Sequence, residues 1–330
     1  MQKIALIGAG AMARVHGEAY ANIENARVVS VVDSCAEAAE KLAASLGVVA
    51  FTSFDDMMSS ESPDLVDICT PTFTHKEYVQ KCAAFGKHAI VEKPMARTVE
   101  DCKEIISAVN RAGITLMVAQ VLRFFPEYAA AKRMVESGAV GNPAVVRISR
   151  GGGHPGGWYA DLDQGGGILM DFMVHDFDWL QWTFGEAERV YARILKARGV
   201  DSIEYALVTI RFKSGMIAHV NGNWAYPIKG FQSEFEIAGD MGLLSFDSLC
   251  QSSMSVYTKP GEGRSVLVPS DYAYKEDPYF LELKHFVDCM EKGDKPMVTP
   301  EDGMRAVRLG QAALESALTG HSIELGNYKI

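Results

Sequence analysis

The first 120 residues alternate short apolar runs with segments of helical periodicity. In a stretch such as Val99–Val109, for example, apolar residues recur at helical spacing. Five runs are continuously apolar, as expected for strands buried on both faces: Ile4–Gly8, Val28–Asp33, Leu65–Thr70, His88–Glu92 and Thr115–Gln120. This alternation predicts an α/β fold in which a doubly wound parallel sheet, the Rossmann arrangement, forms the N-terminal domain.

The pattern changes after about residue 140, where apolar and polar residues begin to alternate one by one. Ala206, Val208, Ile210 and Phe212 fall on one face of such a run. Turn signals at Ser214–Gly215 and Gly239–Gly242 separate the runs, and helical patterns follow near Pro278–Glu291 and Pro300–Leu318. We therefore predict a C-terminal α+β domain with a large, mostly antiparallel, open-faced sheet.

A chain of 330 residues is expected to form two domains. The change of pattern predicts a dinucleotide-binding domain over 1–122 and a domain for substrate binding and oligomerisation over 123–330. It leaves open whether the last helix packs back on the first domain. A sheet with one polar or interface-forming face suits a homodimer or homotetramer built through the C-terminal sheet.

Composition excludes several classes of protein. The net charge of −10 argues against a nucleic-acid partner, and no apolar stretch approaches the roughly 20 residues that span a bilayer. The apolar run after Lys3 ends in a glycine turn after four residues, so it indicates a strand and not a signal peptide. Six scattered cysteines without a CxxC pair are expected to be reduced and packed as small hydrophobes. We expect a cytoplasmic protein without a membrane partner.

The strand that starts at Ile4 runs directly into the pattern G-x-G-x-x-A. Gly8 permits a tight turn, Gly10 lets the backbone approach a pyrophosphate, and Ala13 is small enough for close packing of helix on strand. The helix that follows would direct its first amides at the phosphates. The cofactor-binding residues predicted from this loop are Gly8, Gly10, Ala11, Met12 and Ala13.

Asp33 ends the second strand, where a carboxylate would accept hydrogen bonds from the ribose hydroxyls. A carboxylate also repels a 2′-phosphate, and the adjoining Ser34 and Cys35 supply no arginine to bind one. We therefore expect NAD in preference to NADP, with Asp33 and Ser34 in the cofactor site. The structural alternative is that the glycines form only a tight turn and Asp33 caps the next helix.

Four further motifs occur in order along the chain: Thr70–His75 (TPTFTH), Gly86–Pro94 (GKHAIVEKP), Arg123-Phe124, and Gly165–Asp171 (GGGILMD) through His175. With the glycine fingerprint they resemble the Gfo/Idh/MocA family of glucose–fructose oxidoreductases and inositol dehydrogenases. The resemblance implies a two-domain reductase whose nicotinamide lies at the domain interface, facing a lysine and an Asp-x-x-x-His pair. The cofactor set then also includes Thr70, Pro71, His75, Glu92, Lys93 and Gln120.

The Asp-x-x-x-His pair can be interpreted chemically, because oxidation of an alcohol needs a base for the hydroxyl proton and histidine titrates near working pH. On a regular helix that starts at Ile168, Asp171, His175 and Asp178 fall within about 60° of one another. The structural alternative is a helix with one solvated face. Asp176 falls in the apolar arc, so it either meets a buried donor or the helix is irregular.

Lys93 ends a buried strand just before Pro94, which favours extended backbone and aims the lysine out of the carboxyl edge of the sheet. An ammonium there could stabilise an alkoxide; the alternative is an ordinary surface lysine at a strand end. The catalytic set is therefore Lys93 as electrostatic stabiliser, His175 as proton acceptor or donor, and Asp171 as the group that orients substrate or imidazole.

The remaining candidates concern the substrate. Gln120 and Arg123 could reach the nicotinamide or the substrate, whereas His75 could equally be a satisfied histidine at a helix start. Aromatic residues in a glycine-rich loop could stack on a sugar ring, or they could be incidental to a loop. The predicted substrate residues are Arg123, Trp158, Tyr159, Asp161 and Asp178. No cluster has the ligand spacing of a zinc site, and no Ser–His or Cys–His nucleophile is suggested.

The function expected from these residues is an NAD(P)-dependent oxidoreductase that transfers hydride between a nicotinamide and a hydroxyl or carbonyl carbon. The resemblance implies a sugar, an inositol or a related polyol as the substrate. Two alternatives are an enzyme that retains NAD and uses transient oxidation to eliminate or hydrolyse, and a non-catalytic NAD sensor. A sensor has no need of Lys93, Asp171 and His175.

Overall fold

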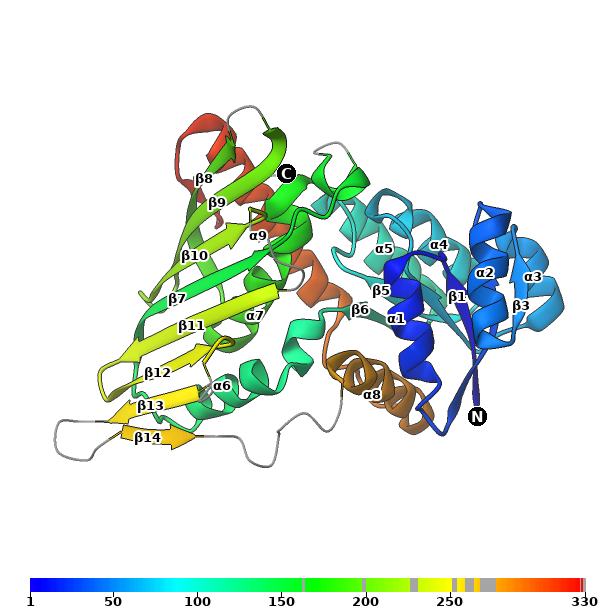
Figure 1. The fold of residues 1–330 in the computed structure, drawn as a ribbon, viewed down its shortest axis with the longest axis horizontal. Helices are drawn as coiled ribbons and strands as arrows, with labels where there is room; N and C mark the ends of the chain where they lie inside the picture. The colour runs from blue at the N-terminus through cyan, green and yellow to red at the C-terminus, as the bar shows by residue number, and fades with distance from the viewer. Residues whose placement is uncertain are drawn as a thin grey trace. The chain divides into compact units, whose positions relative to one another are not determined.

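The computed structural model describes residues 1–161, 164–197, 200–225, 231–250, 254–258, 264–267, 277–326 and 328. The chain divides into two compact units (Figure 1). The first unit comprises Met1–Phe124 and Glu276–Met304, and the second comprises Phe125–Lys275 and Arg305–Ile330. The sequence pattern predicts that 123–330 belong together, whereas in the structure Glu276–Met304 belongs to the first unit.

The first unit contains a six-stranded parallel sheet in the order β3-β2-β1-β4-β5-β6. Its strands are β1 (Gln2–Ile7), β2 (Ala26–Val32), β3 (Val49–Phe51), β4 (Leu65–Ile68), β5 (His88–Glu92) and β6 (Leu116–Ala119). The predicted Rossmann sheet is confirmed. The three-residue edge strand β3 was not predicted, because so short a run carries no readable period. Between β1 and β4 the strand order reverses, and folds of this kind bind ligands at the carboxyl ends of the strands there.

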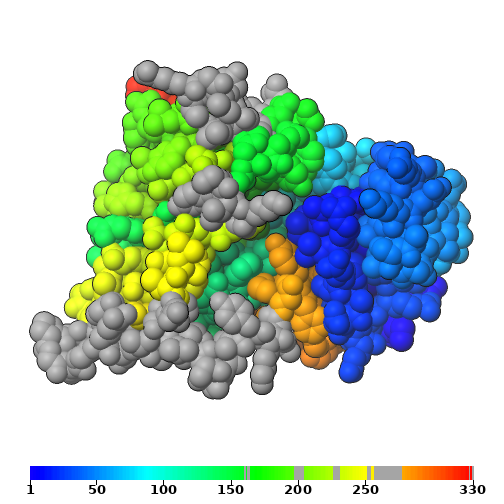
Figure 2. Space-filling model, viewed as in Figure 1, coloured from blue at the N-terminus to red at the C-terminus, as the bar shows by residue number. Residues whose placement is uncertain are grey.

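Helices cover this sheet. They are α1 (Ala11–Tyr20), α2 (Ala36–Leu46), α3 (Phe54–Glu61), α4 (His75–Ala84), α5 (Val99–Ala112) and α8 (Pro278–Lys292), with short 3₁₀ helices η1 (Thr72–Thr74) and η2 (Val121–Phe124). Helix α5 begins where Thr98 accepts a hydrogen bond from the Asp101 amide at 3.1 Å. Helix α8, orange in Figure 2, packs against the blue α1.

The returning segment is held by buried contacts inside the first unit. Arg123 is 2% exposed, and its Nη1 donates to the Met297 carbonyl at 3.0 Å and lies 3.4 Å from Oδ2 of Asp302. The rings of Phe124 and His285 are 5.6 Å apart. Helix α9 (Pro300–Thr319) begins in this unit, which extends to Met304. The sequence left open whether this helix packs back on the first domain, and the structure assigns only its first residues to the first unit.

The second unit contains a nine-stranded mixed sheet in the order β14-β13-β12-β11-β7-β10-β9-β8-β15. Its strands are β7 (Pro143–Gly152), β8 (Ala187–Ala197), β9 (Val200–Phe212), β10 (Ile217–Asn223), β11 (Phe231–Gly239), β12 (Gly242–Asp247), β13 (Met254–Thr258), β14 (Arg264–Leu267) and β15 (Ile323–Glu324). Neighbouring strands pair antiparallel except β7 and β10, which are parallel. The prediction of a mostly antiparallel sheet is confirmed.

One face of this sheet is covered by helices α6 (Pro126–Glu136) and α7 (Val174–Phe184) (Figure 1). Tyr128 of α6 lies edge-on to Trp179 of α7, with ring centroids 5.3 Å apart, and 5.2 Å from Phe235 of β11. The indole Nε1 of Trp179 donates to the Tyr128 carbonyl at 3.1 Å, so the one polar atom of the Trp179 side chain is hydrogen-bonded although it is buried. The alternating apolar residues of β9 are buried toward the same side.

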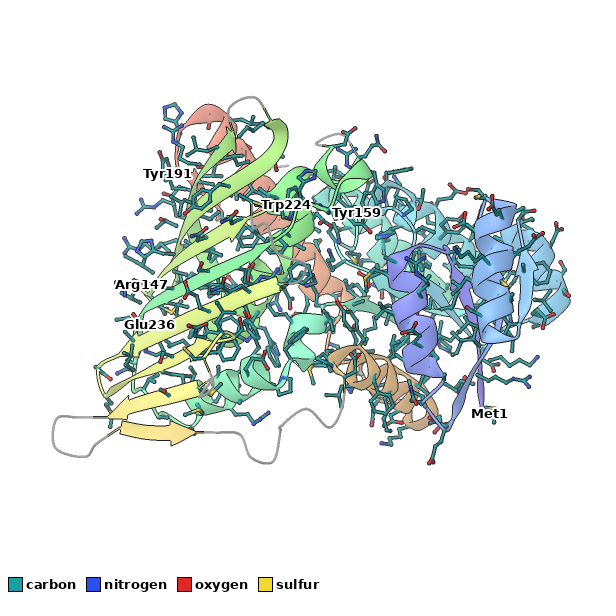
Figure 3. All side chains as sticks on the ribbon, in the orientation of Figure 1. Met1, Arg147, Tyr159, Tyr191, Trp224 and Glu236 are labelled. Atoms are coloured by element: carbon teal, nitrogen blue, oxygen red, sulfur yellow. The ribbon has the colours of Figure 1, made fainter. Side chains whose placement is uncertain are left out.

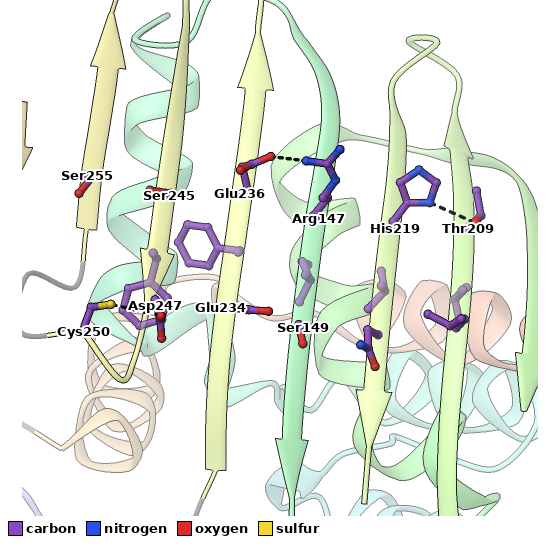
Figure 4. A pocket seen from close by; sticks show the side chains of 17 residues that line it. Arg147, Ser149, Thr209, His219, Glu234, Glu236, Ser245, Asp247, Cys250 and Ser255 are labelled. Atoms are coloured by element: carbon purple, nitrogen blue, oxygen red, sulfur yellow. Dashed lines mark hydrogen bonds and ion pairs between the residues drawn. The ribbon is translucent and has the colours of Figure 1, made fainter. Parts of the chain in front are cut away.

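The opposite face of the sheet carries a row of polar side chains from neighbouring strands. Thr209, His219, Arg147 and Glu236 lie directly across from one another in register, with Tyr191 next in the row. Arg147 Nη1 is 2.6 Å from Glu236 Oε1, and His219 Nδ1 is 3.2 Å from Thr209 Oγ1 (Figure 4). Tyr191, Arg147 and Glu236 lie along the same side of the sheet in Figure 3. The row borders a hollow of about 950 Å³.

All six cysteines are free thiols. Cys69, Cys82, Cys102 and Cys289 are buried, as expected, whereas Cys35 and Cys250 are exposed because they lie in turns after β2 and β12. Within the part of the chain that the structure describes, no helix is both long and apolar enough to cross a membrane.

Candidate active site

The two fingerprint glycines are required for different reasons. Gly8 has φ +99°, and a Cβ there would lie 2.7 Å from the Cys69 carbonyl oxygen, so the contact between the loops after β1 and β4 needs glycine. Gly10 precedes α1 with an ordinary φ of −78°, and a Cβ there would meet nothing within 4 Å. The protein's own packing therefore does not require Gly10. The open space before the N-terminus of α1 fits a pyrophosphate.

Asp33 joins the glycine loop to the start of α2. Its Oδ2 accepts the Ala9 amide at 2.8 Å, and its Oδ1 accepts the Cys35 amide at 2.8 Å. The helix-start role that the sequence left open is therefore present. Each carboxylate oxygen keeps acceptor capacity for a ribose hydroxyl, so the contacts are compatible with both roles. Ser34 beside it is exposed.

A hollow of about 400 Å³ between α1 and α2 bears on the choice of cofactor. Its lining includes Ala9, Cys35 and two cations, Arg14 and Lys41, with Glu37 as the opposing charge. Ser34 and Cys35, the two residues after Asp33, offer no cation to a 2′-phosphate, whereas Arg14 and Lys41 are cations that lie further away in the sequence. Arg14 lies in α1 and Lys41 lies in α2, so neither cation is next to Asp33 in the sequence.

The loops after β4 and β5 are tied together by His75. This residue is 1% exposed; its Nδ1 lies 2.9 Å from the Pro94 carbonyl oxygen and its Nε2 lies 2.9 Å from that of Thr70. Burial holds the pKa of His75 below its ordinary value. A neutral imidazole carries one N–H, so His75 donates to one of these two carbonyl oxygens and packs its other nitrogen against the second at the start of α4. They also fix Thr70 and Pro71 beside the glycine loop, because Gly8 approaches Cys69.

Lys93 follows β5 at the carboxyl edge of the parallel sheet and is half-buried, so it is not an ordinary surface lysine. Its backbone N–H donates to Oε2 of the buried Glu92 at 3.0 Å. Gln120, at the end of β6, is fully buried, and its side-chain amide has no hydrogen-bonding partner among the described residues. An open glycine cradle and an unsatisfied amide at this edge fit a dinucleotide.

The segment that carries Asp171 is not a regular α-helix, so this prediction is wrong. Ile168–Phe172 forms a π-helical turn in which the Met173 N–H donates to the Ile168 carbonyl at 2.9 Å, and α7 begins only at Val174. The buried Glu204 Oε2 accepts the Ile168 N–H at 2.9 Å and so fixes the start of the turn. Wide turns of this kind frequently occur at functional sites.

The polar residues of this segment do not form a solvated face. Asp171 is 7% exposed and Asp178 is 2% exposed, while His175 in the first turn of α7 is half-buried. The alternative of a solvated face is therefore wrong for the two aspartates. Asp171 and Asp178 therefore belong to the packed interior of the second unit and not to its solvated surface.

Asp176 lies at ion-pair distance from an arginine without a hydrogen bond to it, and the helix is irregular, which is one of the two explanations that the sequence left open. Asp176 is fully buried, and Arg150 Nε of β7 lies 3.2 Å from its Oδ1. The same guanidinium donates from Nη2 to the Phe172 carbonyl at 2.9 Å and lies 4.5 Å from the Phe172 ring centroid. Arg150 thus fixes both the π turn and the start of α7, a role that no local sequence signal marks.

Substituting Asp176 by asparagine tests this arrangement through pH dependence. Burial raises the pKa of Asp176 from 3.8 to about 6, although Arg150 opposes it. A raised carboxyl pKa contributes stability that is present below pH 3.8 and lost as pH rises through about 6. Between about pH 4 and 7 the free energy of unfolding should therefore fall about 3 kcal/mol further in the wild type than in Asp176→Asn. Urea unfolding across this range measures it, and parallel curves would contradict it.

The predicted substrate loop forms an aromatic shelf in the second unit. Trp158 and Tyr159, in the 3₁₀ helix η3 (Gly157–Ala160), stack with ring centroids 4.0 Å apart and an interplanar angle of 25°. The Oδ2 atom of Asp161 accepts a hydrogen bond from Gln164 Nε2 at 2.8 Å. Its carboxylate is thus engaged within the loop. Arg123 is engaged in the first unit by the contacts with the returning segment described above.

A Rossmann sheet with an open glycine cradle and a partly buried lysine at its carboxyl edge, joined to a mixed open-faced sheet, defines a two-unit dinucleotide-binding oxidoreductase. The profile of an oxidoreductase family with an NAD-binding Rossmann fold matches residues 2–120, and that of a GFO/IDH/MocA C-terminal domain matches residues 128–245. The chain belongs to the GFO/IDH/MocA family of NAD-binding oxidoreductases.

Several characterised proteins are similar over almost the whole chain. A myo-inositol 2-dehydrogenase of Thermotoga maritima is 30% identical, covering 98% of each chain. A scyllo-inositol 2-dehydrogenase (NAD(+)) of Bacillus subtilis is 29% identical, covering 98% of this chain and 96% of the relative. The structure of a levoglucosan dehydrogenase with NADH and L-sorbose superimposes with a TM-score of 0.88 at 24% identity, covering 98% and 99% of the two chains, and so shares the fold.

Proposed function

We propose that the protein is an NAD-dependent dehydrogenase that oxidises a ring hydroxyl of an inositol or a related sugar, or reduces the matching ketone. The observation that carries the proposal is the placement of the open cradle at Gly10 and of Lys93 at the carboxyl edge of one sheet. A cofactor-binding fold alone needs no half-buried lysine there. The inositol dehydrogenases among the relatives support the substrate class.

The proposed roles follow from the chemistry of an alcohol. NAD, when bound, supplies the acceptor for the hydride that leaves the carbinol carbon. His175 takes the proton from the hydroxyl group, so that both the C–H and the O–H bond are broken and a ketone forms. The Lys93 ammonium stabilises the developing alkoxide. Asp171 orients the imidazole or the substrate, and in ketone reduction His175 returns its proton.

The second unit supplies the proposed substrate contacts. The stacked pair of Trp158 and Tyr159 offers a flat apolar surface to the C–H face of a sugar ring. The buried carboxylate of Asp178 accepts hydrogen bonds from ring hydroxyls. Asp161 is engaged within its own loop, so we propose that it shapes the loop that carries the stacked pair. Arg123 is held inside the first unit, and its role toward the substrate stays a prediction.

A panel of inositols, aldoses and anhydro sugars, each incubated with NAD⁺ or NADP⁺, tests the reaction class through the absorbance of the reduced cofactor. We expect NADH to accumulate in proportion to ketone. Loss of substrate without NADH would show an enzyme that retains NAD and eliminates or hydrolyses. NAD binding without turnover across the panel would favour a sensor. Either result replaces the proposal.

Direct titration of NADH and NADPH tests the cofactor preference. Because Asp33 repels a 2′-phosphate, NADH should bind more tightly than NADPH. Equal affinities would overturn this preference. They would assign the hollow lined by Arg14 and Lys41 to the 2′-phosphate.

We further propose that copies of the chain associate as a dimer or tetramer through the open face of the nine-stranded sheet. The row that includes Arg147 and Glu236 supplies paired charges on the sheet face opposite α6 and α7. Arg147→Glu would place like charges opposite each other, so we expect a lower molar mass by light scattering for this variant than for the wild type. A wild-type monomer would contradict the proposal.

A further inference from the structure

A buried ionic cluster that the sequence did not reveal lies beneath the carboxyl edge of the parallel sheet. His16 of α1 is fully buried; its Nδ1 is 2.8 Å from Asp67 Oδ2 and 3.3 Å from the Cys69 Sγ. On the other side of the ring, Nε2 is 3.2 Å from Glu92 Oε1, an ion-pair contact lying off the N–H axis. Each ring nitrogen thus faces a carboxylate, one from the end of β4 and one from the end of β5.

This geometry favours a doubly protonated imidazole. A neutral ring carries one N–H, so one of the two carboxylates would face a ring nitrogen that has no proton. Two carboxylates in a dry interior also need a compensating cation. The titratable groups packed around the ring are Tyr20 of α1, Asp67 of β4, Cys69 just after β4, Glu92 of β5, and Tyr279 and Glu282 of α8. None of these groups can carry a positive charge, so the imidazole is the cation that faces both carboxylates; Glu92 also interacts with Lys93 and His75.

The electrostatics agree with this assignment. Burial by itself disfavours an imidazolium, but the anionic surroundings, among them the Asp67 carboxylate that accepts from Nδ1, outweigh it and hold the pKa of His16 well above its ordinary value. Burial likewise raises the pKa of the Cys69 thiol, so this group stays neutral. Burial alone would raise the pKa of Glu92, but His16 holds it below its ordinary value. The ion pair is therefore favoured from both sides.

The same three groups, His16, Asp67 and Cys69, have ligand atoms close enough to suggest a metal ion. The distances favour a proton. Ligand atoms around a tetrahedral zinc lie about 3.3–3.6 Å apart when each is about 2.0–2.3 Å from the ion. The 2.8 Å between Nδ1 and Oδ2 is instead the length of a charge-assisted N–H···O bond.

We propose that His16 is a permanently charged positioning residue for Lys93. Its imidazolium fixes one oxygen of Glu92, and the other oxygen of Glu92 accepts the Lys93 backbone N–H at 3.0 Å. The cluster thereby sets the direction in which the chain leaves β5. An effect of His16 on catalysis depends on the proposed function of Lys93. The charge of His16 and its effect on the Lys93 backbone do not depend on that function.

The test combines the protonation state of His16 with hydrogen exchange at Lys93. Nitrogen-15 NMR of histidine-labelled wild type at about pH 7.5 should show both ring nitrogens of His16 protonated. In His16→Gln, the Lys93 amide should exchange at least about 10-fold faster relative to the amides of β2, measured by mass spectrometry with fragmentation. The exposed His321→Gln is the matched control and should leave that ratio unchanged.

A neutral His16 ring, stoichiometric zinc in the purified protein, or an unchanged Lys93 exchange ratio would each overturn the proposal. An equal rise in every amide of the first unit would indicate only a structural role and would also overturn it. Should His16→Gln fail to fold, Glu92→Ala gives the same local readout, because it removes both the oxygen that faces His16 and the oxygen that accepts the Lys93 N–H. If Lys93→Ala keeps its turnover, the proposed function fails while these measurements stand.

Discussion

Replacing Lys93 by alanine is expected to lower turnover at least about 100-fold, the usual loss when a group that stabilises developing charge is removed. The affinity for NADH should change little, because the pyrophosphate cradle is built by the loop around Gly10. Steady-state kinetics with the best substrate of the panel measures the first quantity and NADH fluorescence titration the second. A loss confined to turnover separates a catalytic lysine from one that only shapes the cofactor site.

Lys87 offers the matched control for this experiment. It precedes the same strand at the opposite end, where its Nζ lies 3.4 Å from the Ser62 hydroxyl oxygen. Lys87→Ala removes an equal charge from the same strand and should turn over at the wild-type rate. Near-wild-type turnover in Lys93→Ala would remove the lysine from the catalytic set and leave only the cofactor-binding function.

Gly10→Val should weaken NADH binding at least about 100-fold, or about 2.7 kcal/mol, because the side chain fills the space in front of α1 that a pyrophosphate would take. The fold should tolerate the change, since φ is −78° and nothing lies within 4 Å of the new Cβ. Urea unfolding should show a loss of no more than about 1 kcal/mol, from the less favourable N-cap.

Gly8→Ala should behave in the opposite way. The alanine would have to adopt φ +99° with its Cβ 2.7 Å from the Cys69 carbonyl oxygen, so the free energy of unfolding should fall by about 1–3 kcal/mol or more. Isothermal titration and urea unfolding of both variants separate the two roles. Wild-type NADH affinity in Gly10→Val would show that the glycines form only a tight turn.

Much of the first unit could be predicted because its determinants are local. Strands buried on both faces of a parallel sheet must be continuously apolar, and the glycine pattern follows such a strand directly. In the second unit, the alternation of apolar and polar residues predicted β9, and the turn residues Gly239–Gly242 predicted a hairpin; the structure has both. The three-residue β3 escaped detection because its membership of the sheet depends on pairing with β2.

The site was predicted less completely, because its decisive contacts join distant segments. Arg150 is 26 positions from Asp176, and His16 is 51 positions from Asp67, yet both pairs are within ion-pair distance. A regular helical wheel also failed from Ile168, because Glu204 of β9 holds the start of a wider turn. No period in the sequence encodes such contacts.

The sequence by itself determined the fold class and the cofactor loop, whereas the proposed chemistry of Lys93, Asp171 and His175 rests on the family resemblance and stays a prediction. Short-range sterics and the burial of apolar runs act within a few residues, so they can be read along the chain. Only the tertiary structure decided that Gly10 is free of protein contacts, that Asp171 lies on a π turn, and that His16 bridges two carboxylates. Desolvation and charge pairing depend on which segments meet in space, and folding alone settles that.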